Sequence, residues 1–477
     1  MGNLCGSYGF DCLCPSAAET NPEVAGFIYN GPGRGMQYLS QIFLLGAFLY
    51  HAKLQANCYT DDELQEQADY CEDPASMMNL TRAATPSSMP TVMPTFAEEP
   101  GCEEKVYGFY PSSLITLVQM FCSLVTAFCC PVIGAIVDFT PKRRTYGYNL
   151  MMGVVVINAI QIFTNSDTWF FMLLLQGLAG ALYTCHSICL MAYVPELGSS
   201  DVDGEAPKTE EEINAETTLI MGISRAVEQL SNVIYILIHA AFGMFMECAL
   251  VIPFGDGNYE TGNGRIAQVM SVFIGGPLVW KSWQLLGDRP ALHPLPDGTP
   301  DSCFSLIGVA WGTILNTAFN KLPKQFPMTG LFLLSYTFTE AASGTVLQMA
   351  TIYLGEVLKM RSMSYAILII LVFNIVGALS TMKLAPKVGL QTWWKCSVWS
   401  YIILMFLLVM ICKGPDDVVY AYILFIPLGL TMASLVVAQR AIFARLVSRF
   451  YEAFRNAMEC HEPYPKSPRP HRIQLNI

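Results

Sequence analysis

Charged residues are scarce in this chain. Asp, Glu, Lys and Arg make up 14% of its 477 residues, whereas hydrophobic residues make up 53%. A soluble protein carries roughly 25% charged residues. So few polar side chains cannot cover the surface of a water-soluble globule of this size. The sequence therefore predicts a polytopic membrane protein.

Motifs of enzymes and metal sites are also lacking. The chain has no HExxH, no GxSxG, no His-rich box and no phosphate-binding glycine loop, and its 16 Cys show no paired CxxC spacing. No basic patch is interleaved with aromatic residues, and the amino terminus has neither the charged region nor the cleavage site of a signal peptide. We therefore expect neither an enzyme, nor a cofactor or metal site, nor a nucleic-acid partner.

Long apolar runs are what the chain has instead. A helix needs about 20 apolar residues to cross a bilayer. About ten runs predict transmembrane helices in an all-α fold: 36–55, 113–138, 146–164, 168–193, 218–246, 264–285, 327–352, 363–383, 394–412 and 418–440. The sixth of these, 264–285, is the weakest, because Lys281 interrupts its end. A further apolar segment, 303–318, is interpreted as an interfacial helix.

Composition between the runs divides the chain. Acidic and Pro-rich stretches separate apolar groups, which predicts two bundles joined by a linker. The expected parts are a cytosolic tail 1–33, a six-helix bundle 34–285 with a luminal loop 56–112, a cytosolic linker 286–326, a bundle of about four helices 327–446 and a polar tail 447–477.

Basic residues set the expected orientation. Lys142, Arg143 and Arg144 follow the second run, and further cations follow the eighth and tenth, whereas most of the opposite loops have few. Cations favour the cytosolic side, so the amino terminus is predicted to be cytosolic.

The 56–112 loop then faces a lumen or the exterior. It holds the sequon Asn79-Leu80-Thr81, which predicts a glycan at Asn79. In an oxidising compartment, two of Cys58, Cys71 and Cys102 are expected to form a disulfide, and the spacing does not select the pair.

One motif recurs half a chain apart. "GAIVDFTPKRR" begins at Gly134 and "GALSTMKLAPKVG" begins at Gly377. Such repetition suggests two similar halves around a midplane site. Glycine lets helix ends pack closely, and Asp138 is placed to pair with an Arg or a helix N-terminus across the loop. The motif is either a topology signal alone or a gating latch; the second copy has Thr381 or Met382 in place of the acid.

The first copy resembles the cytosolic signature of the major facilitator superfamily. Other segments are similar to its branch of autophagy-related vacuolar amino-acid effluxers, and the resemblance runs through about residues 26–446. The segments that carry it are "GFIYNGPGRG" (26–35), "LMAYVPEL" (190–197), "GPLVWKSWQLLGDRP" (276–290), "GLFLLSYTFTEAASGTVLQMATIYLGEVLKM" (330–360) and "AQRAIFARL" (438–446).

The resemblance implies a two-bundle carrier that exports amino acids, notably leucine-like ones, from a vacuole- or lysosome-like compartment during autophagy. It also implies twelve helices, two more than the apolar runs supply. A shortened gene model, a natural short form and a non-transporting sensor or scaffold are the alternatives, as is a carrier of another small solute. Protons are expected as a second partner, and the oligomeric state stays open.

Charged residues inside the runs are the candidates for the transport site. An ionisable group at the centre of a membrane costs about 2.5–3.5 kcal/mol, so each needs a reason. Glu340 lies among small and hydroxyl residues and is predicted to bind a substrate ammonium or a proton, unless neighbouring Ser and Thr satisfy it. Arg225 and Glu228 share one helix face, either as an internal ion pair or with Arg225 as the carboxylate partner that complements Glu340.

Isolated polar residues carry weaker predictions. Asn374, in the middle of a run, is expected to hydrogen-bond across its bundle and to line the path. Glu196 either meets the basic cluster at 142–144 or is solvated. Gly2, with Cys5 nearby, suggests lipidation, although Gly6 makes the match imperfect.

Overall fold

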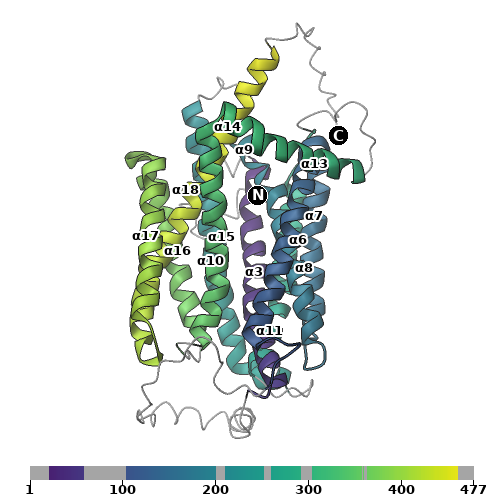
Figure 1. Cartoon of the computed structure of the whole chain (residues 1–477), viewed down its shortest axis with the longest axis vertical. Coiled ribbons are helices and arrows are strands. Elements are labelled where there is room, and N and C mark those ends of the chain that lie inside the picture. The colour runs from purple at the N-terminus through teal and green to yellow at the C-terminus, as the bar shows by residue number, and fades with distance from the viewer. Residues whose placement is uncertain are drawn as a thin grey trace.

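The computed structural model describes residues 21–58, 104–199, 210–251, 259–291, 303–356, 358 and 363–459. Within these ranges the chain is helical, and its extended backbone amounts to one isolated β-bridge between Val106 and Phe109. The all-α prediction is confirmed. The long helices stand side by side in an elongated molecule, and the amino end of the first helix lies toward the same end as the carboxyl end of the last (Figure 1).

The helices of the first half cover the first six predicted runs. They are α3 (Pro22–Gln55), α6 (Pro111–Phe139), α7 (Arg143–Gln161), α8 (Trp169–Met191), the short α9 (Val194–Ser199), α10 (Glu210–Val251), α11 (Tyr259–Met270), the π-helix η2 (Ser271–Gly275) and α12 (Gly276–Leu285). The sixth run is thus three consecutive helical pieces rather than one regular helix.

The remaining helices cover the predicted linker and the last four runs. They are α13 (Cys303–Asn316), the π-helix η3 (Thr317–Lys321), α14 (Leu322–Gln325), α15 (Pro327–Glu356), α16 (Met363–Val388), α17 (Leu390–Ile411), the 3₁₀ turn η4 (Pro415–Asp417) and α18 (Val418–Glu459).

Five helical segments in the described ranges are long and apolar enough to cross a membrane by length and composition alone. Other long helices place polar and charged side chains inside the protein, which lowers their mean hydropathy: α3 buries Arg34 and Gln37, and α10 buries Glu228. The five are Pro111–Phe139, Trp169–Gly198, Tyr365–Val388, Leu390–Ile411 and Pro415–Phe443.

The first helix begins earlier than expected. Asn21 caps it by accepting a hydrogen bond from the Glu23 backbone N–H at 2.9 Å, and Pro22 occupies the first turn. The assignment of residues 22–33 to a tail is therefore wrong. Glycines in this stretch let other helices approach: a Cβ at Gly33 would lie 2.9 Å from the Gly275 carbonyl, and one at Gly31 would lie 3.2 Å from Glu228 Cβ.

The two halves meet along α10, which packs against α16 and α18. Ala226 of α10 shares a small apolar cluster with Ala378, Ala433 and Val437. Farther along the same interface, a larger cluster combines residues of α3, α10 and α11 with Ile367 and Leu371 of α16. The interface therefore consists largely of apolar side chains, many of them small.

Glycine has different roles at the two copies of the repeated motif. A Cβ at Gly377 would collide with the Leu430 backbone carbonyl, so α16 and α18 are in backbone contact there. A Cβ at Gly134 would meet no atom within 4 Å. The predicted close packing is thus found at Gly377 and is wrong for Gly134.

This contrast gives a matched pair of variants. We expect Gly377→Ala to destabilise the protein by about 1–3 kcal/mol, because the new methyl group must push apart two backbones. Gly134→Ala is expected to be neutral or slightly stabilising, because alanine is the better helix former. Thermal unfolding of both purified variants tests this; equal melting temperatures would contradict it.

Candidate functional site

A buried ion pair joins α3 to α10. Arg34 Nη2 lies 2.6 Å from Glu228 Oε2, and the two side chains are 4% and 5% exposed. The other oxygen, Glu228 Oε1, accepts a hydrogen bond from Arg225 Nη1 at 2.8 Å. One carboxylate is thus held by two guanidinium groups, which is how a buried charge is normally tolerated.

A looser pair lies in the second half, between α15 and α18. Arg440 Nη2 is 3.7 Å from Glu340 Oε1, and these side chains are 24% and 41% exposed. Gln439 Nε2 donates to Glu340 Oε2 at 2.8 Å. The Glu340 carboxylate is therefore more exposed than that of Glu228, and its ion pair with Arg440 is longer than the pair between Glu228 and Arg34.

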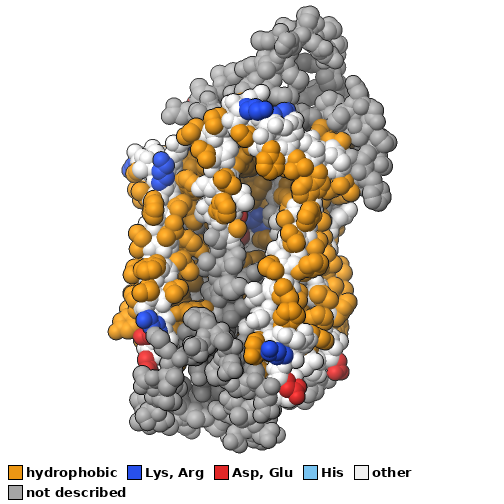
Figure 2. Space-filling view, viewed as in Figure 1, with side chains coloured by type: hydrophobic (Ala, Val, Ile, Leu, Met, Phe, Trp, Pro, Cys, Tyr) orange, Lys and Arg blue, Asp and Glu red, His pale blue; other side chains and the backbone are white. Residues whose placement is uncertain are grey.

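Two tyrosines connect these groups. The rings of Tyr38 from α3 and Tyr183 from α8 stack 5.6 Å apart. Tyr38 interacts electrostatically with Arg225 and Glu340, and Tyr183 does so with Arg440. Charges from both halves therefore act on the same two side chains. Acidic and basic side chains are visible within a hollow between two columns of hydrophobic side chains (Figure 2).

We call Arg34, Arg225, Glu228, Glu340 and Arg440 the central charged cluster. It contains three guanidinium groups and two carboxylates, so its ionised form carries one excess positive charge. An uncompensated charge away from water is costly, and an anionic group of a ligand would neutralise it. Glu340, Arg440 and Arg225 are 41%, 24% and 16% exposed, whereas Arg34 and Glu228 are 4% and 5% exposed.

The sequence located part of this cluster. Arg225 and Glu228 do share one face of α10, and they form the internal ion pair that was one of the two alternatives. The sequence does not predict the role of Arg34, because the expected tail ends at residue 33 and the first apolar run begins at residue 36. The signal was present: Val24, Phe27 and Ile28 are apolar at helical spacing behind the cap residue Asn21.

Arg440 was read only as a topology signal after the tenth run. Helix α18 in fact continues to Glu459, so Arg440 lies within it and faces Glu340. Arg225 and Glu340 form no ion pair with each other among the described contacts.

Asn374 lies outside the central charged cluster. It is 2% exposed on α16, one turn from Leu371 and one turn from Ala378, which both contact α10. Its Oδ1 accepts no hydrogen bond, so the predicted bond across the bundle is not found at this oxygen. Asn374 is thus an interface residue between the halves.

The basic residues in the first copy of the repeated motif make specific contacts within the first half. Arg143 is 1% exposed; its Nη1 donates to Glu196 Oε1 at 3.0 Å and to the Ala192 carbonyl at 3.1 Å, and its guanidinium lies over the Tyr193 ring. The prediction that Glu196 meets this cluster is confirmed. Arg144 Nε donates to the Trp283 carbonyl at 3.0 Å.

The same network continues within the first half. Arg289 pairs with Glu196 at 3.2 Å and with Glu23 at the start of α3. Together with the Arg143–Glu196 pair, these contacts connect α3, α7, α9 and the segment after α12. Lys142 is exposed and Asp138 is half-buried at the end of α6, and the gating role of both stays a prediction.

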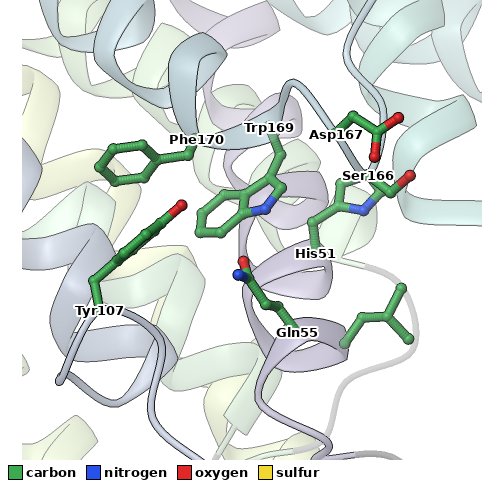
Figure 3. Close-up of a pocket in the computed structure, with 8 residues that line it drawn as sticks. His51, Gln55, Tyr107, Ser166, Asp167, Trp169 and Phe170 are labelled. Atoms are coloured by element: carbon green, nitrogen blue, oxygen red, sulfur yellow. The ribbon is translucent and has the colours of Figure 1, made fainter.

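A pocket opens at the other end of the first half (Figure 3). Its volume is about 260 Å³, and residues from α3, α8 and the turns before α6 and α8 line it: His51, Leu54, Gln55, Tyr107, Ser166, Asp167, Trp169 and Phe170. None of the residues predicted for transport lines it. Cys58, at the nearby end of α3, is disulfide-bonded, in agreement with the expectation that two of Cys58, Cys71 and Cys102 form a disulfide.

Some predicted positions cannot be located. Asn79, Gly2 and Cys5 lie outside the described residues. In the ranges that are described, no group of three or more His, Cys, Asp or Glu side chains could hold a metal ion.

Helices that bracket a charged central site define a polytopic membrane transporter of the major facilitator type. The fold matches the crystal structure of the human organic anion transporter MFSD10 (TETRAN), with a TM-score of 0.54 and 13% sequence identity over 91% of this chain and 87% of that one. A family model described as "Vacuole effluxer Atg22 like" matches residues 98–454. The chain belongs to the Atg22-like vacuole effluxer family. No curated protein matches it in sequence.

The buried pair predicts unequal effects of two similar substitutions. Glu228→Gln leaves the enclosed Arg34 and the partly exposed Arg225 without a counter-charge and is expected to cost about 3–5 kcal/mol of folding free energy. Glu340→Gln removes an exposed and loose pair and is expected to cost about 1 kcal/mol or less. Melting temperatures of the purified variants measure the difference; similar losses for both would contradict it.

The basic cluster gives a second comparison. We expect Arg143→Gln to lower the melting temperature by several degrees, because Glu196 and the Ala192 carbonyl lose a buried donor at a cost of about 1–3 kcal/mol. Lys142→Gln, at the exposed neighbouring position, is expected to change it little. A larger effect at Lys142 would show that the network does not stabilise the first half.

Proposed function

We propose that this transporter exports amino acids from a vacuole-type compartment by alternating access, in support of autophagy. The observation that carries the proposal is the central charged cluster, which offers partly exposed groups of both signs. An amino acid needs both a cationic and an anionic partner. Membership of an effluxer family supports the direction and the compartment.

The exposed pair of the second half supplies the first contacts. At 3.7 Å, Glu340 and Arg440 are far enough apart to exchange each other for a substrate: the ammonium binds the Glu340 carboxylate and the carboxylate binds Arg440. Arg225, 16% exposed and electrostatically coupled to the same tyrosine as Glu340, is the carboxylate partner from the first half. A substrate held from both sides thereby links the two halves.

The interface between the halves suits a rocking motion. Ala226, Ala378 and Ala433 contribute little more than methyl groups, so α10 can tilt against α16 and α18 without breaking polar bonds. The tight Arg34–Glu228 pair keeps α3 and α10 together during that motion. Relative movement is then confined to the contact between halves.

Uptake of radiolabelled leucine into proteoliposomes tests these roles. We expect Glu340→Gln and Arg440→Gln each to raise KM by about 10-fold or more, because each removes a charged hydrogen-bond partner worth about 1.5–3 kcal/mol. Arg225→Lys should have a similar effect through loss of bidentate geometry. Asp416→Asn, an exposed acid in η4 outside the cluster, is the control.

Unchanged leucine uptake by all three variants would exclude the proposed site. A loss in the control as well would indicate misassembly, which size-exclusion chromatography of each variant monitors before reconstitution.

A second candidate substrate is an organic anion without an amino group. The excess guanidinium of the cluster favours it, and a related fold in a human organic anion transporter is compatible with it. One substitution, Glu340→Gln, distinguishes the two candidate substrates. Glu340→Gln should impair amino-acid uptake but preserve or improve uptake of a simple carboxylate, because removal of the negative charge increases the positive excess.

A further inference from the structure

Three aromatic side chains line the pocket at the carboxyl end of α3, apart from the central charged cluster (Figure 3). The Phe170 ring lies 4.8 Å from the Tyr107 ring and meets the Trp169 ring edge-on at 5.7 Å, between ring centroids. Trp169 and Phe170 begin α8, whereas Tyr107 belongs to the turn before α6. Two separate segments of the chain thus form one aromatic wall, called so below.

Tyr107 occupies its place in the aromatic wall at a conformational cost. It is the first central residue of a two-residue hairpin, in which Val106 and Phe109 exchange backbone hydrogen bonds of 3.0 Å. Both central residues, Tyr107 and Gly108, have a positive φ, +51° and +84°. Asn, Asp or Gly normally stands first in such a turn, because other side chains are strained there.

The hairpin by itself therefore gives no reason for a tyrosine at this position. The Tyr107 side chain is 61% exposed, so burial of the ring in the protein does not account for it either. Strain of this kind is typical of ligand-binding sites, where the side chain and not the turn determines the residue. We infer that the exposed ring of Tyr107 serves a ligand of the pocket.

One charged side chain lines the pocket among the residues described, and it is an acid. Asp167 lies in the turn before α8, where Asn165 Oδ1 accepts hydrogen bonds from the backbone N–H groups of Asp167 and Thr168 at 3.1 and 2.9 Å. The exposed Asp167 carboxylate itself accepts no hydrogen bond within the described ranges. An acid here complements the positive end of α8, but that role does not explain the aromatic wall beside it.

An aromatic wall beside a carboxylate suits an organic ammonium ion. The face of an aromatic ring attracts a cation, and a carboxylate pairs with an ammonium group. A ligand carboxylate would find no Lys or Arg in the described lining, so the pocket disfavours a free amino acid, the substrate proposed above. The volume of about 260 Å³ equals that of about nine water molecules in the liquid, so the ligand is small.

We propose that this pocket binds a small primary amine with an apolar body, its ammonium group at Asp167 and its apolar part against Trp169 and Phe170. In Figure 3, Asp167 and Ser166 lie on one side of the Trp169 indole. The Tyr107 and Phe170 rings lie on its other side. The pocket thus has a polar end and an aromatic end. The site goes beyond the proposed function, because its ligand differs from the substrate.

A ligand-observed NMR titration of the purified transporter in lipid nanodiscs tests the proposal, with empty nanodiscs as the blank for partitioning into lipid. The probe is phenethylamine at pH 7.5, where histidine is ordinarily uncharged. We expect saturable binding with a Kd of about 1 mM or below. Phenylacetate has nearly the same body and the opposite charge, and should bind about 10-fold more weakly or worse. Neutral phenethyl alcohol should lie between the two.

Two variants connect binding to the pocket. Asp167→Asn removes the counter-charge and should raise the Kd for phenethylamine by about 5-fold. Tyr107→Asn removes the ring and should raise it by about 2- to 5-fold. Because Asn tolerates a positive φ, Tyr107→Asn should also keep or raise the melting temperature, so its weaker binding cannot come from misfolding. Tyr107→Phe keeps the ring and should bind phenethylamine as the wild type does.

Phenylacetate binding as tight as phenethylamine binding would overturn the proposal, and so would a wild type that binds no more phenethylamine than empty nanodiscs do. An unchanged Kd in both Asp167→Asn and Tyr107→Asn would overturn it as well. The matched control is Asp416→Asn, which removes an exposed acid outside the pocket and should leave the Kd unchanged. Since binding is measured without transport, failure of the amine site is distinguishable from failure of the proposed substrate site.

Discussion

The ion pair between Arg34 and Glu228 is the contact on which the arrangement of the first half depends. It joins two helices far apart in the sequence, and it is enclosed almost completely. A buried pair of this kind contributes little net stability by itself, but it strongly disfavours any arrangement that separates its members. The glycine at position 31 permits the approach, because a side chain there would crowd Glu228. The glycine in α3 thus allows α10 to come close enough for Glu228 to pair with Arg34.

The two halves differ in how their buried or partly buried carboxylates are paired. Glu228 is saturated by Arg34 and Arg225, whereas Glu340 is half-exposed and only loosely paired with Arg440. A saturated carboxylate stabilises a structure, and an accessible one can change partners. The first half has further polar constraints, from the Arg143–Glu196 network to the buried hydrogen bond between Asn158 and Gln37. The second half relies on glycine contacts such as that of Gly377 with Leu430.

These features suggest a division of labour within one fold. The first half is held by directional bonds, and the second half meets it over a surface of mainly apolar contacts along α10. Apolar contacts between small side chains have no preferred partner, so they permit sliding, whereas hydrogen bonds do not.

The sequence by itself determined the membrane class, the approximate positions of the helices and the shared helix face of Arg225 and Glu228, because each follows from composition or from spacing within one helix. It also indicated that Glu196 meets the basic cluster. The tertiary structure alone decided that Arg34 and Arg440 belong to the central charged cluster, that Arg143 is buried, and that Gly134 lacks the close contact found at Gly377. Helical periodicity states which residues share a face, but the crossing points of helices decide which faces meet.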